Sequence, residues 1–308
     1  ARASAARSTE EFTLGLRRML SELREDQARV WKAEDNDLIS FPFLWKFIGD
    51  KLIVTKTIDS QACPLAVGDE VVSINTVPIA DLILEKEEVY MGFSEKYRKN
   101  VALAEIRTGK NFKAEKFEII RNGKQMSFDV KRSHIGNFLS SKKLNAVHRL
   151  PNDILYLDLT LISEKLLKDS ALSFAQSNSV ILDLRGNSVL NEQLLSAFYP
   201  KDIGFSFMIP VFYTPDKERM DWKKVPSPIR SLKKGRVKNV AFLIDEKTKG
   251  NSALIARTAK AIGLGKFFGS PFETSAGNPT ILTMSGAYLF SLTTMLPQID
   301  NEPFSPTT

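Results

Sequence analysis

Short apolar runs alternate with helical patterns in the second half of the chain. Val240 to Ile244 is a continuous apolar run, which is typical of a buried strand in a parallel sheet. Ser252 to Ile262 repeats its apolar residues at helical spacing, and Gly263 follows as a stop signal. Lys266 to Gly269 is a second short strand-like run. The pattern predicts a strand–helix–strand unit, and its first turn lies where ligands of open α/β sheets bind.

The same alternation extends over residues 151–308 and predicts an α/β domain. The predicted strands are Ile154 to Leu161, Ser179 to Leu184, Gly204 to Tyr213 and Ala287 to Met295, and the predicted helices are Ser163 to Phe174 and Asn191 to Phe198. Thr214 to Lys234 is rich in proline and lysine. Loops of that length are usually functional lids or disordered segments, and the pattern favours neither.

The first half of the chain has a different pattern. Glu10 to Lys32 has apolar residues at helical spacing, and Ser8 or Thr9 can cap the helix that this spacing predicts. The stretch that follows is predicted to be β-rich, with one helix from Ala80 to Tyr90. The expected domains are an N-terminal helical segment (1–40), a β-rich domain (41–133), a polar connector (134–150) and the α/β domain (151–308).

Two short motifs define the β-rich domain. Asn122-Gly123 lies between two apolar runs and is the strongest short signal for a β-hairpin. Pro64 to Asn75 reads PLAVGDEVVSIN, in which a Gly-Asp pair precedes a strand-like run and an asparagine. This stretch resembles the PDZ domains of tail-specific proteases, although Thr76 stands where those domains carry glycine.

The PDZ resemblance implies a groove that binds an extended peptide by adding it as a strand to a sheet edge. Such a groove needs backbone N–H groups for the terminal carboxylate, and the candidate loop for them is Ile48, Gly49 and Asp50. The implied ligand is a polypeptide or protein C-terminus. The alternative is a packing module that binds no peptide.

Composition narrows the function classes. The chain has 308 residues, of which 43% are hydrophobic, enough for about two domains. No apolar stretch approaches the ~18 residues that span a bilayer. The net charge is +7, but the lysines are spread along the chain and no nucleic-acid motif accompanies them, so we expect a solvated surface and no nucleic-acid partner.

Cysteine and histidine are scarce. Cys63 is the single cysteine, which excludes an internal disulfide framework and a multi-cysteine metal site. The only histidines, His134 and His148, lie at the ends of the connector and are predicted to be solvated loop residues. We therefore expect neither a metal nor a cofactor.

The strand–helix–strand unit resembles the catalytic core of tail-specific, or C-terminal-processing, serine peptidases and their tricorn-core relatives, which have a crotonase-like or ClpP-like α/β fold. In that family the first serine of a Thr-(Ala/Phe)-Ser-(Ala/Ser) turn is the nucleophile. Thr248 to Ala253 occupies that turn, and Gly250 falls on the nucleophile position. In the lysine-using branch, the position of the catalytic lysine falls on Ser275.

The most specific motif is Asp183 to Asn187, DLRGN, which the same family carries before Pro-Gly-Gly. There the glycine turn supplies a backbone N–H to the oxyanion hole. Here Ser-Val-Leu follows the motif, so the glycine pair is absent. By resemblance, the residues of the oxyanion hole and substrate cleft are Gly186, Asn187, Ser188 and Asn251.

The tricorn-like branch places its catalytic histidine at the end of an N-terminal helical segment, in a Leu-x-Asp-Gly-His-type motif. Leu23 to Val30 is the nearest match, and Ala28 falls on the histidine position. The nucleophile, the base and the glycine turn are thus all substituted. The first hypothesis is a homologue that binds peptides or proteins and has lost the peptidase chemistry.

Two alternatives stay open. In the first alternative, the chain is an active endopeptidase with Ser252 as nucleophile and Lys266 as base. This requires a bulge in the turn that brings Ser252 forward. Serine is, however, favoured at helix starts without any catalytic role. Alternatively, the chain is an assembly component that uses the fold for homo-oligomer contacts. The resemblance implies export to the periplasm or the extracellular space. Ala3-Ser4-Ala5 fits either the end of a secretory signal or a remnant of cloning.

Overall fold

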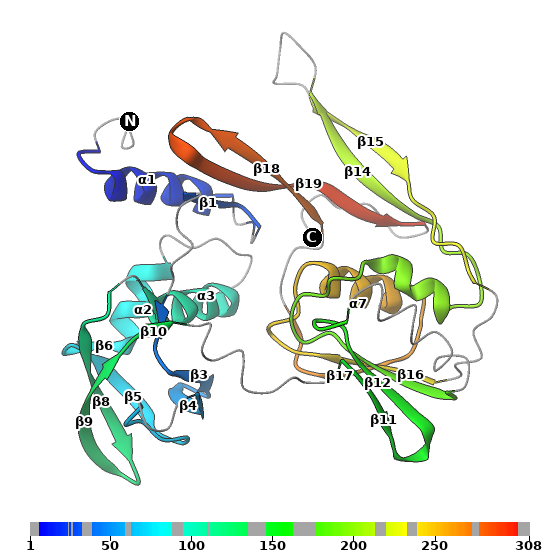
Figure 1. Cartoon of the computed structure of the whole chain (residues 1–308). Coiled ribbons are helices and arrows are strands. Elements are labelled where there is room, and N and C mark those ends of the chain that lie inside the picture. Colours follow the sequence, from blue (N-terminus) through cyan, green and yellow to red (C-terminus); the bar gives the residue numbers. More distant parts are fainter. Residues whose placement is uncertain are drawn as a thin grey trace. The chain divides into compact units, whose positions relative to one another are not determined.

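The chain folds into two compact units in the computed structural model (Figure 1). The first unit comprises Ala1–Arg24, Arg29–Lys143 and Thr283–Phe290, and the second comprises Glu25–Ala28, Leu144–Leu282 and Ser291–Thr308. The structure describes residues 6–23, 25, 27–32, 39–58, 63–87, 95–109, 111–134, 146–162, 177–212, 220–232, 239–272 and 277–300. The predicted helix from Ser163 lies outside these residues.

A six-stranded antiparallel sheet forms the centre of the first unit. Its strands lie in the order β3 (Phe43–Ile48), β4 (Lys51–Thr57), β5 (Glu70–Ile74), β8 (Ala114–Arg121) and β9 (Lys124–Lys131), with β6 (Val77–Pro78) paired to β5. Asn122 and Gly123 have φ values of 51° and 76° and join β8 to β9, which confirms the predicted hairpin. The β-rich, PDZ-like prediction is correct.

Two helices follow β6 in the first unit. The predicted helix is α2 (Ile79–Glu87), whereas α3 (Glu95–Arg107) was not expected, so the prediction of one helix was wrong. The pattern of α3 is weak because its first turns, EKYRKN, are almost entirely polar. Only Ala102, Leu103 and Ile106 of its described side chains are buried. Helix α3 is therefore amphipathic only in its second half.

The N-terminal helix is shorter than its predicted span. Ser8 caps α1 (Thr9–Ser21) by accepting a hydrogen bond from the backbone N–H of Glu11 at 3.1 Å. The helix stops well before Lys32, and Arg29–Lys32 forms strand β1. Val30 and Trp31 are β-branched and aromatic, which favours a strand. The apolar spacing alone did not reveal this change.

Tyr288 joins distant segments of the first unit. Its hydroxyl lies 2.9 Å from the Thr13 hydroxyl, and its ring meets the Phe12 ring edge-on with centroids 5.6 Å apart. The ammonium group of Lys32 lies 5.3 Å from the centroid of the same ring. The start of β19 (Tyr288–Ile299) is thereby packed against α1 and β1.

A three-stranded sheet accompanies the larger one in the first unit. It has the order β10 (Ser133–His134), β2 (Ile39–Ser40) and β7 (Thr108–Gly109). His134 lies in β10, and His148 lies in β11 of the second unit, so the prediction that both are loop residues was wrong. Each is next to an aromatic ring: Phe112 for His134 and Tyr156 for His148.

The second unit is built on the predicted parallel sheet. Its order is β11 (Val147–Leu150), β12 (Ile154–Asp158), β13 (Ser179–Asp183), β16 (Asn239–Ile244) and β17 (Lys266–Gly269), in which only the β11–β12 pair is antiparallel. A short 3-10 turn, Pro151–Asp153, joins β11 to β12. The predicted strand–helix–strand unit is β16, α7 (Asn251–Ala261) and β17.

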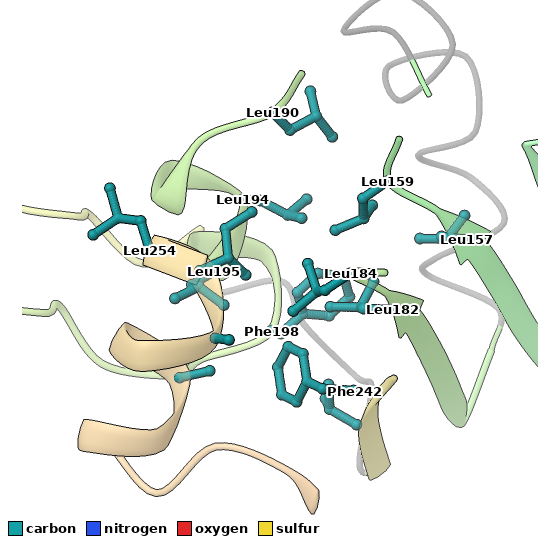
Figure 2. Packing of buried hydrophobic residues seen from close by; sticks show 14 of the residues in the cluster. Leu157, Leu159, Leu182, Leu184, Leu190, Leu194, Leu195, Phe198, Phe242 and Leu254 are labelled. Atoms are coloured by element: carbon teal, nitrogen blue, oxygen red, sulfur yellow. The ribbon is translucent and has the colours of Figure 1, made fainter. Parts of the chain in front are cut away.

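The core of the second unit lies between this sheet and its helices (Figure 2). The 3-10 helix η3 (Glu192–Ala197), where an α-helix was expected, contributes Leu194 and Leu195. Leu254 of α7 and Phe242 of β16 belong to the same buried cluster. The carboxyl edge of the sheet is thus held rigidly by packing beneath it.

Three further strand pairings involve β14, β15, β18 and β19. β14 (Phe205–Phe212) pairs antiparallel with β15 (Met220–Pro226), and the other side of β14 pairs with the end of β19. Residues 220–226 of the Pro- and Lys-rich excursion therefore form a strand rather than a structureless lid. β18 (Asn278–Met284), which was not predicted, pairs with β19, and a 3-10 turn, Ser285–Ala287, joins the two strands.

Candidate functional site

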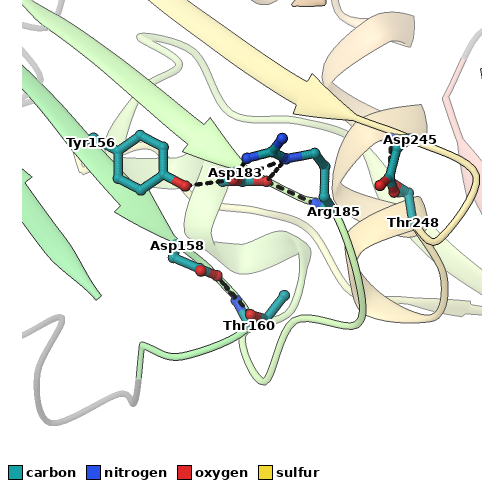
Figure 3. Close-up of polar contacts among 7 residues, drawn as sticks. All are labelled: Tyr156, Asp158, Thr160, Asp183, Arg185, Asp245 and Thr248. Carbon is teal, nitrogen blue, oxygen red and sulfur yellow. Dashed lines mark hydrogen bonds and ion pairs between the residues drawn. The ribbon is translucent and has the colours of Figure 1, made fainter. Parts of the chain in front are cut away.

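Three neighbouring parallel strands carry aspartates at one edge of the second unit's sheet. β12 ends in Asp158, β13 ends in Asp183, and Asp245 directly follows β16 (Figure 3). This is the carboxyl edge, where ligands of open α/β sheets bind. Each carboxylate is already occupied by groups of this chain, as the contacts below show.

Asp183 is buried and held by two donors. Its Oδ2 accepts hydrogen bonds from Arg185 Nη2 at 2.6 Å and from the Tyr156 hydroxyl at 2.5 Å. Burial alone would raise the pKa of Asp183, but these hydrogen bonds outweigh burial and lower that pKa. Burial and the hydrogen bond to Asp183 raise the pKa of Tyr156 to about 12. Asp183 therefore stays ionised and is unsuited to accept a proton near neutral pH.

Asp158 and Asp245 stabilise the turns that follow them. Asp158 Oδ1 accepts hydrogen bonds from the backbone N–H and the hydroxyl of Thr160, at 2.9 and 2.7 Å. Asp245 Oδ1 accepts from the Lys247 N–H at 2.8 Å, and the Asp245 N–H donates to the Thr248 hydroxyl at 3.0 Å. Such local bonds are typical of Asp in turns. No group of three metal-ligating side chains occurs among the described residues.

The loop after β13 and the turn before α7 are joined by hydrogen bonds. The Lys249 N–H donates to the Gly186 carbonyl at 3.0 Å, and the Asn251 side-chain amide donates to the Ser188 carbonyl at 3.2 Å. The Ser188 N–H donates to the Ser252 hydroxyl oxygen at 2.9 Å. The structure thus brings together the cleft residues that the sequence grouped.

Gly250 occupies the strand-to-helix turn at the N-cap of α7, with φ 54° and ψ −127°. Active serine hydrolases of several folds hold their nucleophile on a strained turn of this strand-to-helix kind. Gly250 has no side chain. A Cβ atom added to it would lie 2.4 Å from Asn187 Oδ1 and 3.0 Å from Asn187 Cγ.

Two features of the backbone turn at position 186 require a glycine there. The φ of Gly186 is 139°, which L-residues rarely adopt, and an added Cβ would lie 2.9 Å from the Thr160 methyl carbon. The glycine of the DLRGN motif is thus explained by the turn itself. Its carbonyl, bonded to the Lys249 N–H, points into the contact between the two loops.

Ser252 and Lys266, the alternative nucleophile and base, lie in unsuitable places. Ser252 is fully buried, and its hydroxyl oxygen accepts the Ser188 N–H. Lys266 is exposed and pairs with Ala241 at the amino end of the parallel strands. Ala241 is three residues before Ile244, so Lys266 lies about 10 Å along the strand from the carboxyl edge.

Ala28, at the histidine position, is completely buried, and its N–H donates to the Glu25 carbonyl at 3.2 Å. The polar groups beside it are structural: the Glu25 carboxylate accepts from the Thr293 hydroxyl at 2.6 Å, and the Gln27 amide donates to the Gly277 carbonyl at 2.9 Å. Sequence analysis did not identify the roles of Glu25 and Gln27, although both residues lie within the Leu23 to Val30 stretch. Ser275, at the lysine position, lies outside the described residues.

The proposed carboxylate loop of the first unit is a tight hairpin turn. Ile48 pairs directly with Lys51, so Gly49, with φ 61°, and Asp50 form a two-residue connection between β3 and β4. The structure therefore places these three residues at the tip of the β3–β4 hairpin.

A different part of β3 has the neighbours that a PDZ groove requires. Among the described strands, β3 pairs only with β4, so its other edge has no strand partner there. The Trp45 indole N–H, from β3, donates to the Leu103 carbonyl of α3 at 3.3 Å. This bond places Leu103 of α3 next to Trp45 of β3 in the first unit. Sequence analysis missed this pairing because it did not find α3.

The Gly-Asp pair of the PDZ-like motif holds the first unit together. Asp69 is buried, and its two carboxylate oxygens accept hydrogen bonds from Arg121 Nε and Nη2, both at 2.7 Å. The Ala66 N–H donates to the same carboxylate at 2.7 Å. Asp69 directly precedes β5 and Arg121 ends β8, so the ion pair links two neighbouring strands.

A PDZ-like unit together with a parallel α/β core defines a class: this chain has the fold of the tail-specific, or C-terminal-processing, serine peptidases. Residues 38–144 match the PDZ domain family. Mature CPAF is similar in structure, with a TM-score of 0.72 and 12% identity over 96% of this chain and 81% of that chain. No curated protein sequence matches this chain.

Two further solved structures have the same fold. Mature CPAF complexed with lactacystin has a TM-score of 0.69 and 13% identity, covering 96% of this chain and 82% of that chain. The photosystem II D1 C-terminal processing protease has a TM-score of 0.50 and 12% identity, covering 95% and 78%. The resemblance in fold extends over both units of the chain.

Proposed function

We propose that this protein binds peptides or proteins on a tail-specific peptidase scaffold and does not cleave them. The observation that carries the proposal is the turn at the N-terminus of α7. Gly250, at the nucleophile position, has no hydroxyl, and the nearby Ser252 hydroxyl is buried and bonded to the Ser188 N–H. A serine must reach a substrate carbonyl and have a base that accepts its proton.

A base that could accept the proton of a serine nucleophile is also missing. Ala28 cannot accept a proton, and Lys266 lies exposed at the far end of its strand. The DLRGN turn continues into Ser188, whose N–H donates to Ser252 and is not directed to a substrate. An active peptidase using Ser252 would need the α7 start to rearrange, and no described contact favours that alternative.

Peptide binding is supported by the PDZ match and by the edge of β3. A peptide added to that edge would lie between β3 and α3 and would gain main-chain hydrogen bonds. Lys46 is exposed on β3, so a negative charge introduced there would repel a peptide whose C-terminus is a free carboxylate. The proposed ligand is therefore an extended chain with a free C-terminus.

The first experiment tests for peptidase chemistry. We expect no adduct by intact mass after incubation with a fluorophosphonate probe, and no cleavage of unfolded casein. The Ser252→Ala variant is the matched control. An adduct and casein cleavage that both disappear in Ser252→Ala would contradict the proposal and establish the alternative peptidase.

The second experiment tests peptide binding by fluorescence anisotropy. Labelled peptide libraries with free C-termini should bind, and the same peptides with amidated C-termini should bind at least tenfold more weakly. Lys46→Glu should weaken binding, whereas Lys124→Glu, the same charge change on β9 at the other edge of the sheet, should not. Equal binding of free and amidated peptides would contradict recognition of the free C-terminus, and no binding of either would leave only a partner-docking or assembly role.

Export to the periplasm or the extracellular space is also part of the proposal, and it rests on the family resemblance. No helix among the described residues is long and apolar enough to cross a bilayer. Fractionation of cells that express the natural gene would test export, with the protein expected outside the cytoplasmic fraction.

A further inference from the structure

The Asn187 side chain occupies the space in front of the α7 N-terminus. Its Oδ1 accepts a hydrogen bond from the Asn251 N–H at 3.2 Å. The same oxygen would lie only 2.4 Å from a Cβ on Gly250, a distance that real Cβ contacts essentially never show. Asn187 and any side chain at position 250 therefore compete for one volume.

The hydrogen bonds around Asn187 hold it in that position. On one side, the Lys249 N–H is bonded to the carbonyl of Gly186. On the other side, the buried Ser188 donates its N–H to the buried Ser252 hydroxyl, and its carbonyl accepts the Asn251 side chain. These bonds fix both chain neighbours of Asn187, so the backbone of Asn187 cannot withdraw without breaking them.

An asparagine at this motif position does not by itself block a cleft, since the DLRGN motif of the resembled peptidases ends in asparagine too. What differs is the segment that follows. Here Ser188 replaces the start of the Pro-Gly-Gly turn, and its hydrogen bonds to Ser252 and Asn251 draw the loop against α7. The inward position of the Asn187 amide goes together with these hydrogen bonds.

We propose that the Asn187 carboxamide is an internal blocking group. It takes the Asn251 N–H at the positive end of α7, where a peptide carbonyl oxygen would have to be held, and so denies this donor to a substrate. This inference rests on the proposed non-catalytic function and deepens it. Peptides would then bind to the first unit and not at the α7 turn.

The competition for space is tested by a double-mutant cycle on the full chain. Gly250→Ala adds only the overlapping Cβ, and Asn187→Ala removes the carboxamide. We expect Gly250→Ala to shift the folding equilibrium strongly toward the unfolded state. In the Asn187→Ala background, the same substitution should shift the equilibrium constant about tenfold less. Denaturant unfolding of the four proteins gives the coupling.

Gly263→Ala is the matched control for backbone strain. Gly263 lies just beyond the other end of α7 with φ 67°, and an added Cβ there meets no atom within 4 Å. The loss of stability caused by Gly263→Ala should therefore be the same with and without Asn187→Ala. If Gly250→Ala costs the same in both backgrounds as well, the blocking role of Asn187 is wrong. If Gly250→Ala alone does not fold, Asn187→Ala must restore folding, and failure to do so overturns the proposal equally.

A second measurement reads the hydrogen bond directly. In Asn187→Ala, native-state exchange of the Asn251 amide proton should become at least tenfold faster. Asn191→Ala is the control, because Asn191 Oδ1 accepts from the Gln193 N–H at the start of η3 and does not touch α7's first N–H. Unchanged exchange in Asn187→Ala would contradict the inference. These readouts measure stability and exchange, so their failure leaves the peptidase and peptide-binding tests unaffected.

Discussion

Arg121 donates two hydrogen bonds, both 2.7 Å long, to the two carboxylate oxygens of the buried Asp69. A bidentate pair of this kind is stronger than a single charged contact. Removing one partner leaves the other charge buried without compensation. The ion pair joins the Gly-Asp motif of the PDZ-like unit to the end of β8, so the unit's stability depends on it.

The first prediction concerns this pair. Arg121→Met should destabilise the first unit by about 3 kcal/mol, because it leaves the Asp69 carboxylate buried and unpaired. Urea unfolding measures the change. The double variant Arg121→Met with Asp69→Asn should recover much of the loss, since no buried charge then remains. A loss in the double variant as large as in Arg121→Met would show that lost packing, not charge, is the cause.

The pH dependence of the same pair has a definite sign. Burial would raise the pKa of Asp69, but the hydrogen bonds from Arg121 and Ala66 outweigh burial and lower that pKa below 3.8. A lowered pKa in the folded state gives stability that is present above the ordinary pKa and lost as pH falls through the folded value. The difference between the natural chain and Arg121→Met should therefore shrink at acid pH.

The second prediction concerns two turns that differ in one residue. Asn75 and Thr76 connect β5 to β6 with φ values of 50° and 70°, close to those of Asn122 and Gly123, 51° and 76°. A β-branched residue with positive φ is strained. Thr76→Gly should stabilise the chain by about 1 kcal/mol, and Gly123→Thr should destabilise it by a similar amount. Unfolding free energies of the two variants should thus shift in opposite directions.

The third prediction concerns Glu105, which lies 3.1 Å from Arg17. Burial raises the pKa of Glu105 despite this ion pair. A raised pKa means that stability is greatest below the ordinary value and is lost as pH rises through the folded value. Glu105→Gln should therefore not destabilise the chain at neutral pH. Asp69→Asn, which removes the carboxylate whose pKa is lowered, should destabilise it under the same conditions.

The fourth prediction concerns Tyr156. The pKa of its phenol is raised to about 12 by burial and by the hydrogen bond to Asp183. Absorbance at alkaline pH should therefore show one tyrosine that ionises only near pH 12, and Tyr156→Phe should remove that step. Because the folded pKa is raised, the stability contributed by this contact is kept up to pH 10 and is lost as pH rises toward 12.

The strand–helix–strand unit could be predicted because each of its elements has a strong local signal. Val240 to Ile244 is uninterrupted and apolar, and Gly263 marks the helix end. Helix α3 could not be found in this way, because its first half is polar. Strand β18 has only partly buried or exposed side chains, so no alternation marks it.

Of the candidate site, a family motif placed Gly186, Asn187, Ser188 and Asn251 at neighbouring strand ends, and the structure brings these residues together. The motif did not reveal that the Asn187 amide occupies the space beside Gly250. That contact joins loops about 63 residues apart and depends on where one side chain points. Periodicity and motif spacing carry no information about such an orientation.

Tyr288 has a consequence for the order in which the chain folds during synthesis. Its hydroxyl bonds to Thr13 across 275 positions of sequence, and residues 283–290 belong to the first unit. The sheet of the PDZ-like unit is complete by Lys131, yet α1 has no Tyr288 to pack against until almost the whole second unit has been translated. Arg17 of α1 can reach Glu105 before then, but the Phe12 and Thr13 contacts of α1 with Tyr288 form only after translation has passed residue 288.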